Sequence, residues 1–191
     1  MILKFDRKLN RMPRYDYSQP GYYFVTICTK DGTEFFGEIK DEKMNMNEYG
    51  EIVFKYWNQI PEYYKNVCID KFIIMPNHLH AIIIINDVGR VGTEYYSVPT
   101  ANTNKLNTDL IDEKPSYGLL SNIIKSSKRE STICIRKYLK DYDFQWQRSF
   151  HDHIIRDEDD LARIRQYIKD NSCKWHLDRN NPENINKKAH I

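Results

Sequence analysis

The stretch over residues 72–85 constrains the fold of this chain most, because two imidazoles interrupt a long apolar run. Its sequence is FIIMPNHLHAIIII, so two apolar runs flank a short polar break. Apolar runs without alternation are typical of strands that are buried on both faces, and the Pro-Asn pair suits a turn between them. The sequence therefore predicts two adjacent strands over residues 67–75 and 78–86 inside a sheet.

The two histidines of this stretch stand at positions i and i+2. In a strand, the side chains of His78 and His80 leave on the same face, opposite to Leu79. Two neighbouring imidazoles repel each other as cations and are favoured as neutral groups, which is the form that binds a metal. Either histidine alone is consistent with a hydrogen-bonded structural role. The pair on one face favours a metal site.

Composition sets limits on the class of protein. The chain has 191 residues, of which 40% are hydrophobic and 29% charged, as in one globular domain. The four cysteines show no C-x-x-C pairing, so we expect reduced thiols rather than a zinc ribbon. No apolar run is long enough for a membrane span and no signal peptide is recognisable, so we expect a cytoplasmic protein without a membrane partner. No Walker A sequence is present, so we expect no ATP.

The remaining pattern predicts an α+β fold. A strand, a helix, two strands, a helix and a strand follow each other, and another helix comes last. This order predicts a ferredoxin-like antiparallel sheet with helices on one face, plus a C-terminal helix. The expected elements are a strand over 22–29, a short edge strand over 33–39, a helix over 47–60, the two central strands, a helix over 117–139, a strand over 147–156 and a helix from 157 onward.

We expect one domain over residues 1–191. Within it we expect a basic arm over 1–16, a long loop over 87–116 and a polar tail over 176–191. The net charge of +2 is too small to indicate a nucleic-acid partner by itself. However, the predicted helix over 117–139 and the residue after it hold six basic residues against one acid. Such a face is either solvated or in contact with phosphates.

A tyrosine and an amide share one face of the predicted C-terminal helix. Leu161, Ile164 and Ile168 form its apolar stripe. Tyr167 stands at i+3 from Ile164, and Asn171 stands at i+4 from Tyr167, so both project beside that stripe. A helix that packs on the sheet would aim both side chains at the histidine pair. The alternative is a tyrosine at the edge of the core, since the chain contains 14 tyrosines.

Several separated motifs resemble the single-tyrosine HUH transposases. They are MPNHLH over 75–80, WQRSFHDHIIR over 146–156 and IRQYIKDN over 164–171. The chain is most similar to the REP-associated tyrosine transposases, which are relatives of insertion-sequence transposases. The segments YYFVTICT and FGEI resemble the opening of that family, and the likeness covers roughly residues 11–175.

The resemblance implies a metal-dependent enzyme that nicks and transfers single-stranded DNA through a 5′-phosphotyrosine. By match of motif, Tyr167 is the nucleophile, and His78, His80 and Asn171 are ligands of magnesium or manganese. The implied partner is hairpin-forming single-stranded DNA, bound by a monomer or by a homodimer.

Ser172 stands where relatives often have proline, and the loop over 87–116 matches nothing in the family. Candidate DNA contacts are Lys125, Lys128, Arg129 and Arg14, and His153 is a candidate supporting residue.

Two other functions stay open at this point. A second H-x-H, His151-Asp152-His153, permits a zinc hydrolase or structural zinc site in which His78, His80, His151 and His153 close a tetrahedral shell. A ferredoxin-like module could also bind nucleic acid without catalysis, by stacking bases on Tyr22, Tyr23 and Phe24.

Overall fold

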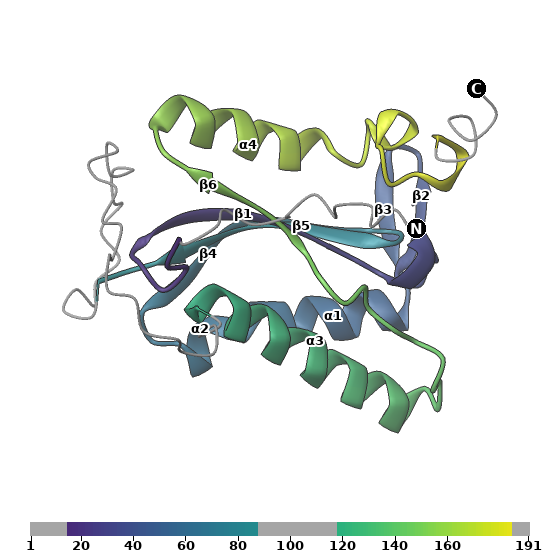
Figure 1. Cartoon of the computed structure of the whole chain (residues 1–191). Helices are drawn as coiled ribbons and strands as arrows, with labels where there is room; N and C mark the ends of the chain where they lie inside the picture. Colours follow the sequence, from purple (N-terminus) through teal and green to yellow (C-terminus); the bar gives the residue numbers. More distant parts are fainter. Residues whose placement is uncertain (1–14, 88–117, 185–191) are drawn as a thin grey trace, which may run out of the picture.

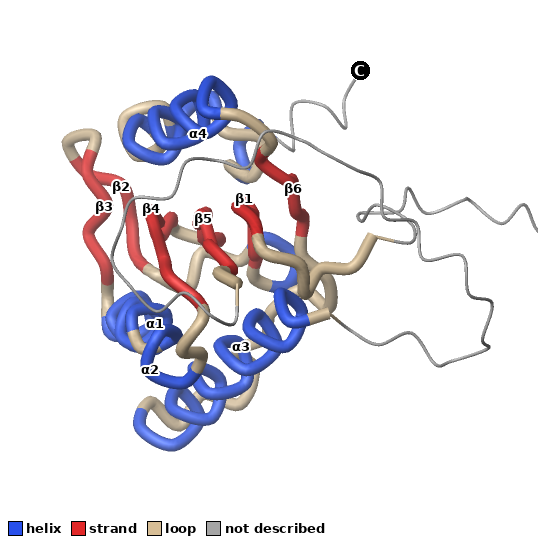
Figure 2. The backbone as a smooth tube through the Cα atoms, turned by 90° about the vertical axis from the view of Figure 1, so that its left-hand side faces the viewer, coloured by secondary structure: helices blue, strands red, loops and turns tan. Residues whose placement is uncertain are grey.

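A four-stranded antiparallel sheet forms the centre of the computed structural model, which describes residues 15–87 and 118–184. The spatial order is β4-β5-β1-β6, with the first and third strands of the motif in the middle, as in a ferredoxin-like sheet (Figure 2). The expected fold class is therefore confirmed. The strands are β1 (Gly21–Cys28), β4 (Val67–Met75), β5 (His78–Ile85) and β6 (His151–Ile155).

Strands β4 and β5 are joined by the two residues Pro76 and Asn77, so that Met75 pairs with His78. Along β5, alternate side chains enter two different cores. Leu79, Ala81, Ile83 and Ile85 belong to the larger cluster, whereas Ile82 belongs to the smaller one on the opposite face. The histidines share the face of Ile82, because they stand at even positions of the same strand.

Helices α1 (Glu48–Asn58) and α3 (Leu119–Tyr138) cover one face of the sheet (Figure 1). The side chain of Asn47 caps α1 by accepting hydrogen bonds from the backbone N–H groups of Tyr49 and Gly50. Pro61 falls in the first turn of the short helix α2 (Ile60–Tyr63), where its missing N–H is tolerated. Trp57 of α1 and Ile123 of α3 are fully buried in the larger core.

Helix α4 (Glu158–Asp170) lies on the other face (Figures 1 and 2). The Asp157 carboxylate accepts from the backbone N–H of Asp160 and begins the helix. Leu161, Ile164 and Ile168 are buried against the sheet, as the stripe predicts. Each such aliphatic side chain contributes about 1.5–3 kcal/mol on burial, which is enough to hold the helix on this face.

A small second sheet corrects the prediction of one edge strand over 33–39. Strands β2 (Gly37–Lys40) and β3 (Lys43–Met46) form a separate hairpin. Its turn residues Asp41 and Glu42 have φ of 50° and 60°, a conformation that glycine or asparagine usually supplies. The sequence lacks that signal, so the second strand was missed.

Two short 3₁₀ helices, η1 (Lys30–Gly32) and η2 (Trp175–Leu177), complete the described elements. No helix among the described residues is long and apolar enough to cross a membrane. The basic arm up to Arg14 and all but the first residue of the expected loop over 87–116 lie outside the described residues.

Candidate active site

The two imidazoles meet on the face of the sheet that α4 covers. His78 and His80 are 0% and 1% exposed. Their Nε2 atoms lie 3.0 Å apart, so the two rings point at one common position. Phe24 of β1 stacks on His80 with ring centroids 5.4 Å apart. The predicted pairing of the histidines on one face is confirmed.

Burial keeps both imidazoles neutral. Desolvation lowers the pKa of His78 well below its usual value, and the neighbouring His80 lowers it further. Desolvation also lowers the pKa of His80, while the nearby carboxylate of Asp178 opposes that shift. Two neutral imidazoles side by side present lone pairs, which is the state required of metal ligands.

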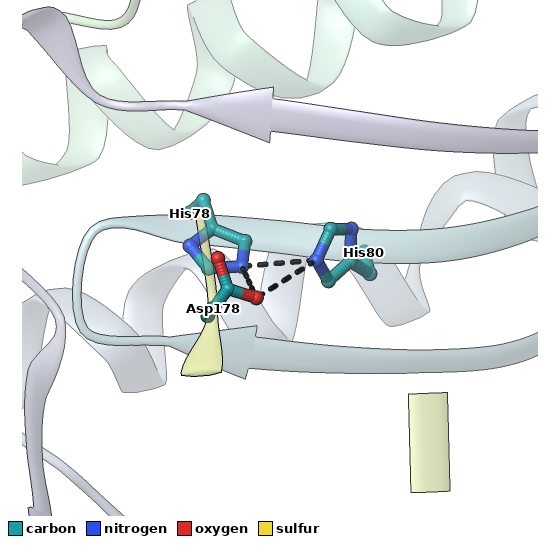
Figure 3. A group of neighbouring side chains, drawn as sticks. All are labelled: His78, His80 and Asp178. Carbon is teal, nitrogen blue, oxygen red and sulfur yellow. Dashed lines mark hydrogen bonds and ion pairs between the residues drawn. The ribbon is translucent and has the colours of Figure 1, made fainter. Parts of the chain in front are cut away.

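Asp178 enters the site from the segment that follows α4. Its Oδ2 lies 3.9 Å from Nε2 of His78 and 4.0 Å from Nε2 of His80, and Figure 3 shows the contacts. Burial raises the pKa of Asp178, but the nearby imidazoles of His80 and His78 and the backbone N–H of Asn180 outweigh it, so the pKa lies well below its usual value. The carboxylate is therefore an anion beside two neutral donors.

The segment that carries Asp178 folds back over the end of the sheet where β5 begins. Trp175 packs on His78 with ring centroids 5.9 Å apart, and the carbonyl of Asn180 accepts from Nδ2 of Asn77 at 2.8 Å. Sequence reasoning placed Asp178 and Asn180 in a polar tail over 176–191 and missed Asp178 as a site residue. No motif or periodicity marks it, because its contacts depend on a turn after the helix.

Helix α4 brings the predicted tyrosine and amide to the same place. The hydroxyl of Tyr167 lies 3.0 Å from Nε2 of His80 and 3.5 Å from Oδ2 of Asp178. Tyr167 as a whole residue is 41% exposed, while its hydroxyl faces the buried histidine pair. Burial of the hydroxyl and the charge of Asp178 raise its pKa, while Asn171 lowers it, so it is protonated at neutral pH.

Asn171 has an unsatisfied oxygen at this site. Its Nδ2 lies 3.4 Å from Oδ2 of Asp178, and its side chain is buried. Its Oδ1 is also buried and has no hydrogen-bond partner among the described residues. An orphaned buried oxygen costs about 1–3 kcal/mol unless something pairs with it. A cation would satisfy this oxygen.

The donor set therefore fits a divalent metal. The ligand atoms of His78, His80 and Asp178 all lie within 4.8 Å of one another. The group offers two imidazole nitrogens and a carboxylate oxygen and contains no thiolate, a set of donors that divalent metals accept. The amide oxygen of Asn171 is a further candidate ligand.

The four-histidine zinc shell is not assembled in the described part of the chain. The group of side chains that could hold a metal ion consists of the histidine pair and Asp178, and it includes neither His151 nor His153. Both of these β6 residues are exposed, and Nε2 of His153 instead lies 2.6 Å from the carboxylate of Asp160. His153 thus links β6 to the first turn of α4. It does not touch the histidine pair.

The proposed base-stacking surface on β1 is also absent. Tyr22 and Tyr23 are 4% and 0% exposed, and they fill the two cores on opposite faces of the sheet. Phe24 packs on His80 and Tyr167, within the site. The aromatic residues of this strand therefore build the protein interior rather than a platform for bases.

The basic residues of α3 differ in their surroundings. Lys125 and Arg129 are exposed, and Arg129 pairs with its neighbour Glu130. The ammonium of Lys128 donates to the carbonyl oxygens of Gln147 and Ser149 at 2.8 and 3.0 Å, and burial lowers its pKa to about 8. An open hollow of about 450 Å³ lies beside these residues. It is lined by Lys128, Arg129, Thr132, Ile133, Arg136, Phe144, Gln145, Trp146 and Gln147.

Fold and site together define one class: a ferredoxin-like domain with a buried two-histidine centre facing a tyrosine on its own C-terminal helix. The chain matches no family model. It is 36% identical over 174 residues to an uncharacterized protein of Haemophilus influenzae, covering 90% of this chain and 91% of that one. It is 26% identical over 161 residues to a protein of the same species that is named a REP-associated tyrosine transposase, covering 84% and 75%.

A solved structure shares the fold. The chain aligns with a REP-associated tyrosine transposase bound to a REP hairpin, with a TM-score of 0.54 and 15% sequence identity, over 86% of this chain and 73% of that one. The chain is therefore similar in sequence to a REP-associated tyrosine transposase of Haemophilus influenzae, and it shares the fold of the solved one.

Proposed function

We propose that this protein cuts and rejoins single-stranded DNA, with Tyr167 as the nucleophile and a divalent cation at the histidine pair. One observation supports this most strongly. The Tyr167 hydroxyl lies 3.0 Å from Nε2 of His80 and 3.5 Å from the carboxylate of Asp178 within one chain, and the amide of Asn171, whose oxygen is unpaired, contacts the same carboxylate. A tyrosine at the edge of the core would have no need for this group of donors.

The bonds that form and break in the covalent step belong only to the DNA and the tyrosine. The phenolic oxygen of Tyr167 attacks the scissile phosphorus and loses its proton, while the bond from phosphorus to the 3′ oxygen breaks. The leaving 3′ oxygen takes up a proton and becomes a free hydroxyl. The product is a 5′-phosphotyrosine, which a 3′-hydroxyl can attack later to restore a phosphodiester. Because the phosphotyrosine ester keeps the energy of the phosphodiester that was broken, rejoining requires no ATP.

The chain's own residues prepare this attack. His78, His80, Asp178 and the amide oxygen of Asn171 would hold the cation. When bound, a divalent cation supplies positive charge that stabilises the transferring phosphate and favours the ionised phenol. Oδ2 of Asp178, 3.5 Å from the hydroxyl, orients the phenol of Tyr167. The buried apolar stripe of α4 packs on the sheet and thereby sets how far the ring of Tyr167 lies from the sheet.

The proposed substrate is single-stranded DNA next to a hairpin. The related solved transposase is bound to a REP hairpin, and the α3 face offers exposed cations for a phosphate backbone. Lys125 and Arg129 are the proposed contacts within the described residues. Lys128 acts differently, since its ammonium is already bound to two carbonyl oxygens.

A nicking assay tests the proposal. Labelled single-stranded DNA with a hairpin is incubated with wild-type protein, with His78→Ala and with the exposed-site control His176→Ala, in manganese and in excess chelator. We expect cleavage by wild type and by the control only when metal is present, and none by His78→Ala. DNA binding should survive in all three proteins, because phosphate contacts do not require the metal. Full cleavage in excess chelator would exclude the metal.

A further inference from the structure

Asn77, the residue before His78, is held in one orientation by its neighbours. Its Nδ2 donates to the carbonyl oxygens of Gly32 and Asn180 at 2.9 and 2.8 Å. Carbonyl oxygens only accept hydrogen bonds, so the amide cannot be turned around. Oδ1 of Asn77 therefore faces Nδ1 of His78, at 2.8 Å. Because Oδ1 is also an acceptor, the proton of His78 must be on Nδ1.

The orientation of Asn77 decides the state of both rings. With its proton on Nδ1, His78 presents a lone pair at Nε2. That atom lies 3.0 Å from Nε2 of His80, where two facing lone pairs would repel. In the neutral, metal-free pair, a proton on Nε2 of His80 removes this repulsion, and the hydroxyl of Tyr167, 3.0 Å from the same atom, then donates to Oδ2 of Asp178. Nδ1 of His80 then accepts from the hydroxyl of Thr26, at 2.8 Å.

A cation at this position requires a different state of His80. Both Nε2 atoms must then offer lone pairs, so the proton of His80 has to be on Nδ1. A hydroxyl can accept as well as donate, so Thr26 pairs with His80 in both states. Thr26 is opposite His80 in the register of β1 and β5, and it is 2% exposed, so water does not replace it.

We propose that Asn77 and Thr26 are positioning residues for the metal centre: Asn77 locks His78 in its ligand form, and Thr26 allows His80 to exchange tautomers when a cation binds. This rests on the proposed metal function. Asn77 also links the pair to the segment of Asp178, because its amide holds the carbonyl of Asn180. One side chain thus sets the direction of one ligand and the position of another.

Nitrogen NMR of ¹⁵N-histidine-labelled protein reads the tautomers directly. In chelator, we expect His78 with its proton on Nδ1 and His80 with its proton on Nε2. In saturating magnesium, His78 should keep its tautomer and His80 should change to Nδ1–H. A metal-free His78 with its proton on Nε2 would overturn the role of Asn77. A His80 that keeps one tautomer with and without bound magnesium would overturn the role of Thr26.

Variants separate positioning from mere stability. Thr26→Val removes the hydroxyl and keeps the shape, whereas Thr26→Ser keeps the hydroxyl. Asn77→Ala is compared with Asn181→Ala, a buried amide that also donates to a backbone carbonyl but touches neither histidine. Losses of outer partners typically weaken metal binding by about 10- to 100-fold. We expect such losses of manganese affinity, read by electron paramagnetic resonance, for Thr26→Val and Asn77→Ala only.

The results keep the two proposals apart. If Thr26→Val and Asn77→Ala bind manganese as wild type does and only unfold more easily, the two residues are structural and the positioning proposal fails. If wild type binds neither manganese nor magnesium, the metal function fails together with the role of Thr26. The metal-free spectrum still decides the tautomer of His78 in that case, because it needs no cation.

Discussion

Nε2 of His80 and the hydroxyl of Tyr167 lie 3.0 Å apart, although 87 residues separate them in the same chain. The described residues of one chain therefore bring the tyrosine, the histidine pair and a carboxylate together. No second copy is needed to complete this group. The contact exists because β5 and α4 face each other, and because the buried stripe of α4 turns Tyr167 toward the sheet.

The first prediction concerns the acidic ligand. Asp178→Asn keeps the shape of the side chain and removes its negative charge. Since Asp178 is the anion beside two neutral imidazoles, we expect manganese affinity to fall at least about tenfold, or about 1.4 kcal/mol. Asn171→Ala should reduce affinity less, because it removes a neutral oxygen. Calorimetric titration with manganese measures both, and an unchanged affinity in Asp178→Asn would show that the carboxylate is not a ligand.

The second prediction concerns the anchoring of α4. The guanidinium of Arg165 donates to both carboxylate oxygens of Asp70 on β4, at 2.7 and 2.9 Å. Arg165→Ala should lower the free energy of unfolding by only about 1 kcal/mol, because its side chain is one-third exposed. It should also slow cleavage, because Tyr167 is two residues away on the same helix. Urea unfolding and nicking rates measure the two effects.

The matched control for this tether is Arg163→Ala. Arg163 pairs with Asp160 on the same helix, so its loss leaves α4 attached to the sheet. Equal slowing of cleavage by both variants would show that the contact between α4 and β4 has no positioning role.

The third prediction is a pH dependence of metal-free stability. The pKa values of His78 and His80 are lowered in the folded protein, so below about pH 6.5 the unfolded chain binds protons that the folded chain does not. The free energy of unfolding should therefore fall with decreasing pH, by up to about 1.4 kcal/mol per unit for each histidine. The lowered pKa of Asp178 acts in a separate window, below about pH 4.

Urea unfolding in chelator, at pH values between about 4.5 and about 7, measures this slope. The histidine effect is expected below about pH 6.5, the ordinary imidazole pKa, and the carboxyl effect only below about pH 4. His78→Leu should show a shallower slope than wild type. Equal slopes in the two proteins would mean that His78 is not held neutral by the fold.

The fourth prediction separates the cations of α3. Lys125→Gln and Arg129→Gln should weaken DNA binding and each reduce the salt slope by about one, because each lost phosphate contact releases one counterion fewer. Lys128→Met should instead lower the free energy of unfolding, since it removes two hydrogen bonds to the segment over 147–149. Fluorescence anisotropy at several salt concentrations measures binding. Unaltered salt slopes would make the α3 face a solvated surface only.

Much of the site could be predicted because local periodicity carried the information. The i and i+2 spacing of the histidines in a strand, and the i+4 spacing of Tyr167 and Asn171 in a helix, determine which side chains share a face. The sheet order follows from the order of the elements. These relations can be derived from the sequence with only the side-chain period of a strand and that of a helix.

Other parts of the site depend on contacts that no period reveals. Asp178 reaches the histidines through a turn after α4, and Asn77 binds the carbonyls of Gly32 and Asn180, which are 45 and 103 residues away. The strand Lys43–Met46 was missed because its turn has positive φ at Asp41 and Glu42 without glycine. Lys128 looked like a phosphate contact, and only the fold shows its ammonium bound to carbonyl oxygens.

The fifth prediction tests the nucleophile, with Tyr167→Phe as the variant. It removes one oxygen and keeps the ring beside Phe24, so folding and DNA binding should be preserved. Wild-type protein with manganese and hairpin-bearing single-stranded DNA should form a denaturant-resistant adduct at the 5′ side of the cut, with a free 3′-hydroxyl on the other fragment. Mass spectrometry should locate the phosphate on Tyr167, and the Phe variant should form neither adduct nor cut. Undiminished cleavage by Tyr167→Phe would contradict the account and make Tyr167 a structural residue.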